Sequence, residues 1–180
     1  MINKFLESTN IIMEPLDEKH ITEEYCSWLN NEEVVKYNSH GIFPHTLKST
    51  KEYVESSQNR SQITLAIIDK KSKLHIGNIA IYKIDFINSN ADISIIIGNK
   101  DFWGKGVGFE AFSLAISHCF NKLNLHRVTA GTASDNIAMQ KTLEKLSMKR
   151  EGTLKDAMQR ENKYIDIYLF AILKNEFIKK

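Results

Sequence analysis

Three glycines lie within five residues of one another near the middle of the chain, and they constrain its fold more than any other feature. Gly104, Gly106 and Gly108 come directly before a helical pattern, although the whole chain contains only eight glycines. Glycine tolerates positive φ angles and leaves neighbouring backbone N–H groups uncovered. A loop of this kind at a helix N-terminus is typical of a site for phosphate or pyrophosphate. The alternative interpretation is a tight turn without a ligand, which one glycine alone would favour.

The region before the glycines predicts an antiparallel sheet. Residues 63–68, 74–84 and 92–97 are rich in isoleucine and are separated by short polar breaks, which predicts three consecutive strands joined by turns. These strands follow a short strand and three helical segments, at residues 11–13, 17–29, 32–37 and 49–54.

The region after the glycines predicts helices that alternate with strands. Phe112, Ile116 and Phe120 recur at helical spacing. A strand, a helix and a final strand follow, at residues 127–132, 135–146 and 164–173. The fold class that results is α+β, with a mostly antiparallel sheet covered by helices rather than a doubly wound parallel sheet.

Composition excludes several classes of protein. The net charge is +2 and the lysines are scattered, which disfavours a nucleic-acid binder. Cys26 and Cys119 are too few for a disulfide framework or a cysteine zinc site, and we expect no metal. The longest apolar runs fall far short of the roughly 20 residues of a membrane helix, and no secretory signal is recognisable. We therefore expect one cytoplasmic domain over residues 1–180, without a membrane or nucleic-acid partner.

Two familiar phosphate loops fit the glycines poorly. The P-loop pattern requires Ser or Thr after its lysine, but Gly106 follows Lys105. The dinucleotide fingerprint G-x-G-x-x-A is matched by residues 106–111, which leaves a nicotinamide-binding oxidoreductase open as an alternative. In a dinucleotide-binding domain, however, these glycines open the first strand-to-helix turn of the chain. Here about half of the chain precedes them, so we rank this alternative second.

A third loop matches better. The segment from Trp103 to the helix resembles the acyl-CoA loop of the GNAT acetyltransferase superfamily, whose pattern is [Q/R]-x-x-G-x-[G/A]. Gly106 and Gly108 match the two pattern glycines, whereas Trp103 stands at the Gln/Arg position. The chain is most similar to the RimJ and RimL-like branch, specifically from Ala91 to Gly152. Residues 43–46 and 75–79 are also similar to sugar-nucleotide N-acyltransferases.

The resemblance implies a GNAT-type sheet in which two central strands splay apart. The pantetheine arm of acetyl-CoA, or of another short acyl-CoA, would lie in the notch between them, and its pyrophosphate would lie on the glycine loop. The cofactor-binding residues implied in this way are Ile95, Ile96, Ile97, Trp103, Gly104, Lys105, Gly106, Val107, Gly108, Phe109 and Asn136. An alternative role for Asn136 is to cap the helix that follows it.

The implied reaction transfers an acyl group from the thioester to a primary amine by direct attack. Neither cysteine has a convincing nucleophile context. Asp92 is the candidate base, with a turn residue or a substrate anchor as its alternative roles. His40 and His45 are alternative bases, because an ordinary histidine pKa of about 6.5 suits this task. Leu143 stands where many relatives carry a tyrosine acid.

The resemblance identifies the acceptor amine less closely. The preferred acceptor is a nucleotide-linked amino sugar of surface polysaccharide synthesis, with Tyr37, His45, Tyr164 and Asp166 as candidate substrate contacts. A protein N-terminus of the ribosomal type and a polyamine are the alternative acceptors. A non-catalytic CoA-binding domain is an alternative from another class, and a homo-oligomer stays open.

Overall fold

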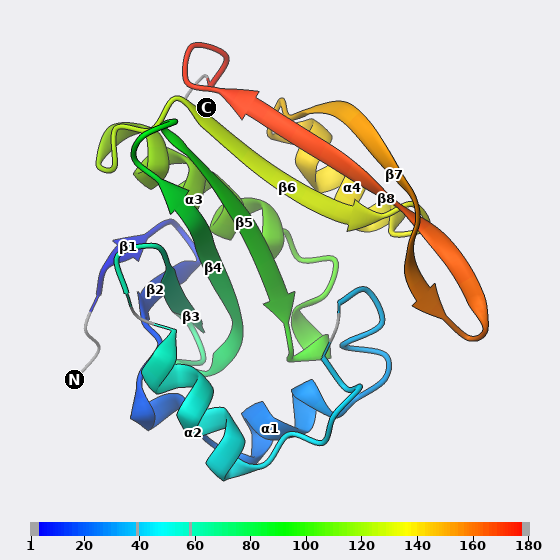
Figure 1. Cartoon of the computed structure of the whole chain (residues 1–180). Coiled ribbons are helices and arrows are strands. Elements are labelled where there is room, and N and C mark those ends of the chain that lie inside the picture. The colour runs from blue at the N-terminus through cyan, green and yellow to red at the C-terminus, as the bar shows by residue number, and fades with distance from the viewer. Residues whose placement is uncertain (1–3, 39, 58, 178–180) are drawn as a thin grey trace.

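The computed structural model describes residues 4–38, 40–57 and 59–177 (Figure 1). Eight strands within these ranges form one sheet in the order β1-β2-β3-β4-β5-β6-β8-β7. They are β1 Leu6–Glu7, β2 Ile11–Pro15, β3 Ile63–Asp69, β4 His75–Asp85, β5 Asn90–Ile97, β6 Arg127–Ala133, β7 Lys149–Arg160 and β8 Lys163–Leu173. The helices are α1 Glu23–Leu29, α2 Leu47–Ser56, α3 Val107–Asn121 and α4 Ile137–Lys145, with short 3-10 turns η1 Glu18–His20 and η2 Lys100–Phe102. The expected α+β class is confirmed.

The centre of the sheet opens into a notch. β5 and β6 are parallel, whereas the other neighbouring strands are antiparallel. Their pairing runs only from Asn90 opposite Arg127 to Asp92 opposite Thr129. Beyond this point the two strands diverge, as Figure 1 shows. The edge of β5 that faces the notch therefore carries backbone groups without a β6 partner, and the splay implied by the resemblance is present.

The two faces of the sheet carry different helices. On one face, α3 and α4 pack over a large core that includes Ala91 and Ile93 of β5. On the other face, α1 and α2 pack over a smaller core that includes Ile96. Because side chains alternate along a strand, Asp92 and Ser94 lie on the face of α1 and α2.

Close packing with Trp28 of α1 fixes the end of β5. A Cβ atom added to Gly98 would lie 1.9 Å from a ring atom of Trp28, so no larger residue fits without displacing the ring. The N–H groups of Gly98 and Asn99 both donate to the carbonyl of Ile76. The chain consequently leaves the sheet at Gly98 and enters the glycine loop.

Three local predictions need correction. The helix expected over residues 32–37 is a series of turns, because the Asn31 side chain accepts N–H groups of Glu33 and Val34. The helix expected from Ser49 begins at Leu47 with Thr46 as its N-cap. β7 was not predicted as a strand, because it is an edge strand with an almost entirely exposed, polar sequence.

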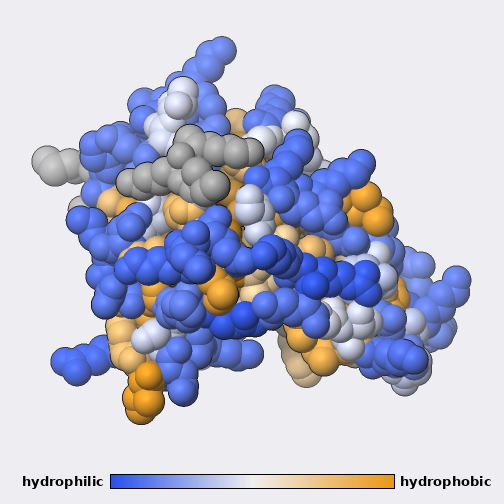
Figure 2. Space-filling view, turned by 90° about the horizontal axis from the view of Figure 1, so that it is seen from above, coloured by the Kyte–Doolittle hydropathy of each residue, from blue (hydrophilic) through white to orange (hydrophobic). Residues whose placement is uncertain are grey.

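Among the described residues, no helix is long and apolar enough to cross a bilayer. Seen from above, hydrophilic side chains cover most of the molecule, and hydrophobic ones appear in small separate groups (Figure 2).

Candidate functional site

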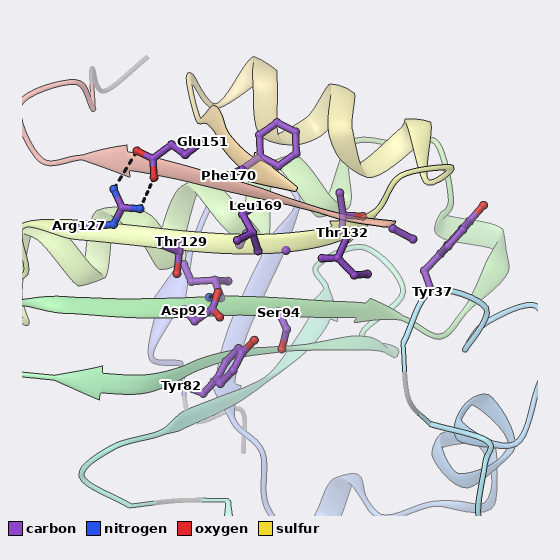
Figure 3. A pocket seen from close by; sticks show the side chains of 16 residues that line it. Tyr37, Tyr82, Asp92, Ser94, Arg127, Thr129, Thr132, Glu151, Leu169 and Phe170 are labelled. Atoms are coloured by element: carbon purple, nitrogen blue, oxygen red, sulfur yellow. Dashed lines mark hydrogen bonds and ion pairs between the residues drawn. The ribbon is translucent and has the colours of Figure 1, made fainter. Parts of the chain in front are cut away.

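A cavity of about 600 Å³ occupies the notch and is called the first cavity below. Its walls come from β4, β5, β6, β7 and β8 and from the loop after α1. Figure 3 shows the Arg127–Glu151 pair at one end and Tyr37 at the other. The polar side chains around it are Tyr37, Tyr82, Asp92, Ser94, Arg127, Thr129, Thr132 and Glu151.

Asp92 lies beside Tyr82 in this cavity. The two residues are directly opposite each other in the β4–β5 ladder. Burial and the neighbouring Asp92 carboxylate raise the pKa of the Tyr82 hydroxyl to about 12, so it stays protonated and can donate a hydrogen bond to that carboxylate. Sequence reasoning missed Tyr82. The alternation of side chains along β4 shows on which face of the sheet Tyr82 lies. Only the register of the β4–β5 hairpin shows that Asp92 is its neighbour.

The second carboxylate of the first cavity already has a cationic partner. Arg127 forms a bidentate pair with Glu151, in which Nη1 donates to Oε1 at 3.0 Å and Nη2 donates to Oε2. This pairing lowers the pKa of Glu151. Asp92 is therefore the carboxylate of this cavity that has no arginine partner and can bind an incoming ammonium group.

The glycine loop has the geometry of an anion site. Gly106 is the N-cap of α3, with φ +82°, and Gly104 has φ +71°. A Cβ atom added at Gly104, Gly106 or Gly108 would meet no atom within 4 Å, so the space beside these backbone groups is open. Because the first N–H groups of a helix have no intrahelical acceptor, those that open α3 can bind an anion.

The remaining CoA candidates have partners within the protein. The Trp103 indole Nε1 donates to the carbonyl of Ile97 at 2.8 Å, which ties the loop to the end of β5. The Lys105 ammonium lies 5.4 Å from the centre of the Phe102 ring. The side-chain oxygen of Asn136 accepts the Met139 N–H at 3.2 Å, so this residue forms the helix cap that was its alternative role. Ile95, Ile96 and Ile97 pair with β4 on one side and lie beyond the β6 pairing on the other.

The two candidate histidines lie together in the segment between α1 and α2. The described residues around the first cavity include neither His40 nor His45. Their rings lie edge to face, with centroids 5.3 Å apart. Burial, together with the charge of His45, lowers the pKa of His40. His40 lines a smaller cavity of about 90 Å³, called the second cavity below.

Of the other candidate acceptor contacts, Tyr37 lines the first cavity, whereas Tyr164 and Asp166 do not. The Arg160 guanidinium lies 5.2 Å from the centre of the Tyr37 ring. Tyr164 is 65% exposed, at the start of β8. Asp166 accepts the Asp156 N–H through its side chain and the Ser134 N–H through its carbonyl, so it holds the backbone of neighbouring segments.

The cysteines and Leu143 lie in the cores. Burial raises the pKa of the Cys119 thiol to about 12, and the sulfur of Cys26 lies 3.3 Å from the Thr50 hydroxyl inside the protein. Leu143 is fully buried beneath the sheet. Within the described ranges, no group of three His, Cys, Asp or Glu residues could hold a metal ion. Because both thiols are buried, neither is placed to act as a nucleophile.

Comparisons with known proteins agree with this geometry. A sequence model of the acetyltransferase (GNAT) domain matches residues 10–149. The chain is 31% identical over 157 residues to the uncharacterized N-acetyltransferase p20 of Bacillus licheniformis, covering 84% of this chain and 86% of that protein. It is 29% identical over 101 residues to the putative ribosomal N-acetyltransferase YdaF of Bacillus subtilis, covering 56% of this chain and 55% of that one.

A solved structure shows the same fold. The spermidine N-acetyltransferase of Vibrio cholerae, in complex with CoA and spermine, superimposes with a TM-score of 0.83. The match covers 92% of this chain and 96% of that one at 21% sequence identity.

Proposed function

This chain belongs to the GNAT family of acetyltransferases and is an acyl-CoA-dependent N-acetyltransferase, and we propose that its acceptor is an amino sugar carried on a nucleotide. The observation that supports this acceptor is the polar lining of the first cavity, which combines several hydroxyl groups with one carboxylate that has no arginine partner. We further propose that residues 1–180 form one domain, and that it works in the cytoplasm.

The hydroxyl groups favour a polyol. Tyr82, Ser94, Thr129 and Thr132 line the first cavity. The Thr129 hydroxyl donates to the Ala91 carbonyl at 3.3 Å and is left to accept from a ligand, whereas the Ser94 and Thr132 hydroxyls can both donate and accept. Sugar hydroxyls have the same dual capacity, so they can replace the water that these groups otherwise bind. Tyr37 lies at the far end of the cavity, where the Arg160 guanidinium also lies over its ring.

A polyamine fits this lining less well. A polyamine carries several positive charges and is best held by several unpaired carboxylates. In the first cavity, the carboxylates are Asp92 and Glu151, and Arg127 already neutralises Glu151.

The proposed reaction uses direct attack. The pantetheine arm lies along Ile95 to Ile97, and the pyrophosphate lies on N–H groups of residues 104–109. The amine nitrogen bonds to the thioester carbon, the carbon–sulfur bond breaks, and Asp92 accepts the proton that the amine loses. A water molecule passes a proton to the departing thiolate and takes up the proton that Asp92 accepted, because the Leu143 side chain has none to give. A β5 backbone N–H near Ile95 stabilises the oxyanion.

Thiol release with acetyl-CoA tests the acceptor. We expect kcat/KM for a UDP-linked amino sugar to exceed that for spermidine, or for a peptide with a free N-terminus, by about tenfold or more, since unpaired buried groups penalise a poorly matched ligand. Faster turnover of spermidine or of the peptide would contradict the proposed acceptor.

One variant sharpens this comparison. Arg127→Gln leaves Glu151 as a second unpaired carboxylate, so it should raise the rate with spermidine relative to the rate with the amino sugar. Arg150→Gln is the matched control, because Arg150 stacks on Tyr168 outside the first cavity. An unchanged ratio in Arg127→Gln would contradict the proposed role of charge in acceptor choice.

A further inference from the structure

The second cavity meets the first at one residue. It lies between the sheet and the α1–α2 region, and Ser94 lines both cavities. Ile95 and Ile96 continue its wall along β5, and Asn78 and Ala80 face it from β4. At about 90 Å³, it has room for a group of only a few non-hydrogen atoms.

One residue in the wall of this cavity carries a buried donor. Asn78 is 6% exposed, and its Nδ2 atom makes no hydrogen bond within the part of the chain that the structure describes. The Tyr25 hydroxyl lies near this amide but does not complete a bond of normal geometry to Nδ2. Because a buried donor without an acceptor is costly, Asn78 indicates a missing partner.

The neighbouring His75 fixes which way the Asn78 amide points. His75 Nε2 lies 3.0 Å from the carbonyl of Gly77, which can only accept, so Nε2 carries the hydrogen. The same Nε2 lies 2.8 Å from Asn78 Oδ1, which is therefore the oxygen. Burial lowers the pKa of His75 to about 4, so the ring is neutral near pH 7 and keeps this role. Nδ2 is therefore the Asn78 atom that is left without an acceptor in the described residues.

The position of Asp92 decides which substrate enters which cavity. If the pantetheine arm follows Ile95 to Ile97, the thioester reaches Ser94, where the two cavities meet. Asp92 and Tyr82 line the first cavity, so the amine approaches the thioester from that side. The second cavity is then the space left for the acyl group.

We propose that the second cavity is an acyl subsite, and that it selects short acyl groups carrying an oxygen that accepts a hydrogen bond from Asn78 Nδ2. This inference rests on the proposed function, which supplies two premises: the pantetheine arm lies along β5, and the amine approaches from the side of Asp92. A plain alkyl chain would leave Nδ2 unpaired, whereas a β-hydroxyl group on the acyl chain would satisfy it. A 3-hydroxybutyryl thioester is the simplest donor with this chemistry.

Calorimetric titration without any amine tests the subsite. The probes are CoA, acetyl-CoA, butyryl-CoA and each enantiomer of 3-hydroxybutyryl-CoA. We expect one 3-hydroxybutyryl enantiomer to bind about fivefold more tightly than butyryl-CoA, the size of one net hydrogen bond. Equal binding of butyryl-CoA and both 3-hydroxybutyryl-CoA enantiomers, or binding of acetyl-CoA alone, would overturn the subsite.

Asn78→Leu removes the Nδ2 donor at nearly constant side-chain size. His75 Nε2 retains its hydrogen bond to the Gly77 carbonyl in this variant. This variant should bind CoA normally and lose the preference for the hydroxyacyl thioester. Asn88→Leu is the matched control, in the exposed turn after β4. A preference that persists in Asn78→Leu would overturn the assignment.

The titration also separates this inference from the proposed acceptor. If the protein binds a 3-hydroxybutyryl thioester preferentially but turns over no amino sugar, the proposed acceptor is wrong and the proposed acyl subsite is retained. Failure of CoA itself to bind would overturn both.

Discussion

Replacing Gly106 with asparagine is expected to weaken acetyl-CoA binding by about 30-fold or more, which is the loss of one or two charge-assisted hydrogen bonds. Gly106 has φ +82°, and the space beside its Cα is open. An asparagine side chain would fill the space in which we place the pyrophosphate. The fold should lose only about 1 kcal/mol or less, because asparagine tolerates the left-handed region better than most residues. Isothermal titration measures the binding, and thermal unfolding without ligand measures the stability.

A truncated thioester provides the control for Gly106→Asn. Acetyl-pantetheine lacks the pyrophosphate, so its binding should be the same in the variant and in the unaltered protein. Equal losses for acetyl-CoA and acetyl-pantetheine would mean that the substitution distorts β5 or the notch. Unchanged acetyl-CoA binding would remove the pyrophosphate from this loop.

Asp92→Asn is expected to lower kcat by about 100-fold or more, the usual contribution of a general base. Asparagine keeps the shape of the side chain and can still accept a hydrogen bond from Tyr82, but it cannot accept the proton of the amine. CoA binding should be unchanged, because Asp92 lies at the closed end of the notch, where β5 and β6 still pair. Thiol release measures the rate, and titration measures the affinity for CoA.

Asp101→Asn is the matched control for Asp92→Asn. Asp101 is exposed in η2, so this variant makes the same charge change outside both cavities. It should retain its turnover. A rate for Asp92→Asn close to that of Asp101→Asn would remove Asp92 from the proton transfer and leave it as a substrate anchor.

Local sequence patterns predicted the features that depend on neighbouring residues. The glycine loop was predictable because positive φ at Gly104 and Gly106 and the helix start at Val107 are properties of a short segment. The isoleucine-rich strands β3, β4 and β5 were predictable because each is a largely buried apolar run bounded by short polar segments. The alternative role of Asn136, a helix cap, was visible for the same reason.

Features that depend on distant residues were not predictable in this way. The Arg127–Glu151 pair joins β6 to β7, and β7 has no apolar alternation that would identify it as a strand. The position of Tyr82 beside Asp92 depends on hairpin register. His40 and His45 were candidates by their pKa and by their loop, which borders the acceptor site in the family, and this loop faces the second cavity through His40.

The central claim is that acyl-CoA and amine meet in the notch and react without an acyl-enzyme. The kinetic pattern obtained with both substrates varied tests this claim most directly. The measurement is the initial rate of thiol release over a grid of acetyl-CoA and amine concentrations, with the amine that gives the largest signal. The account predicts double-reciprocal lines that intersect, because both substrates must be bound before transfer. Parallel lines would contradict it, because they indicate a covalent acyl-enzyme formed before the amine binds.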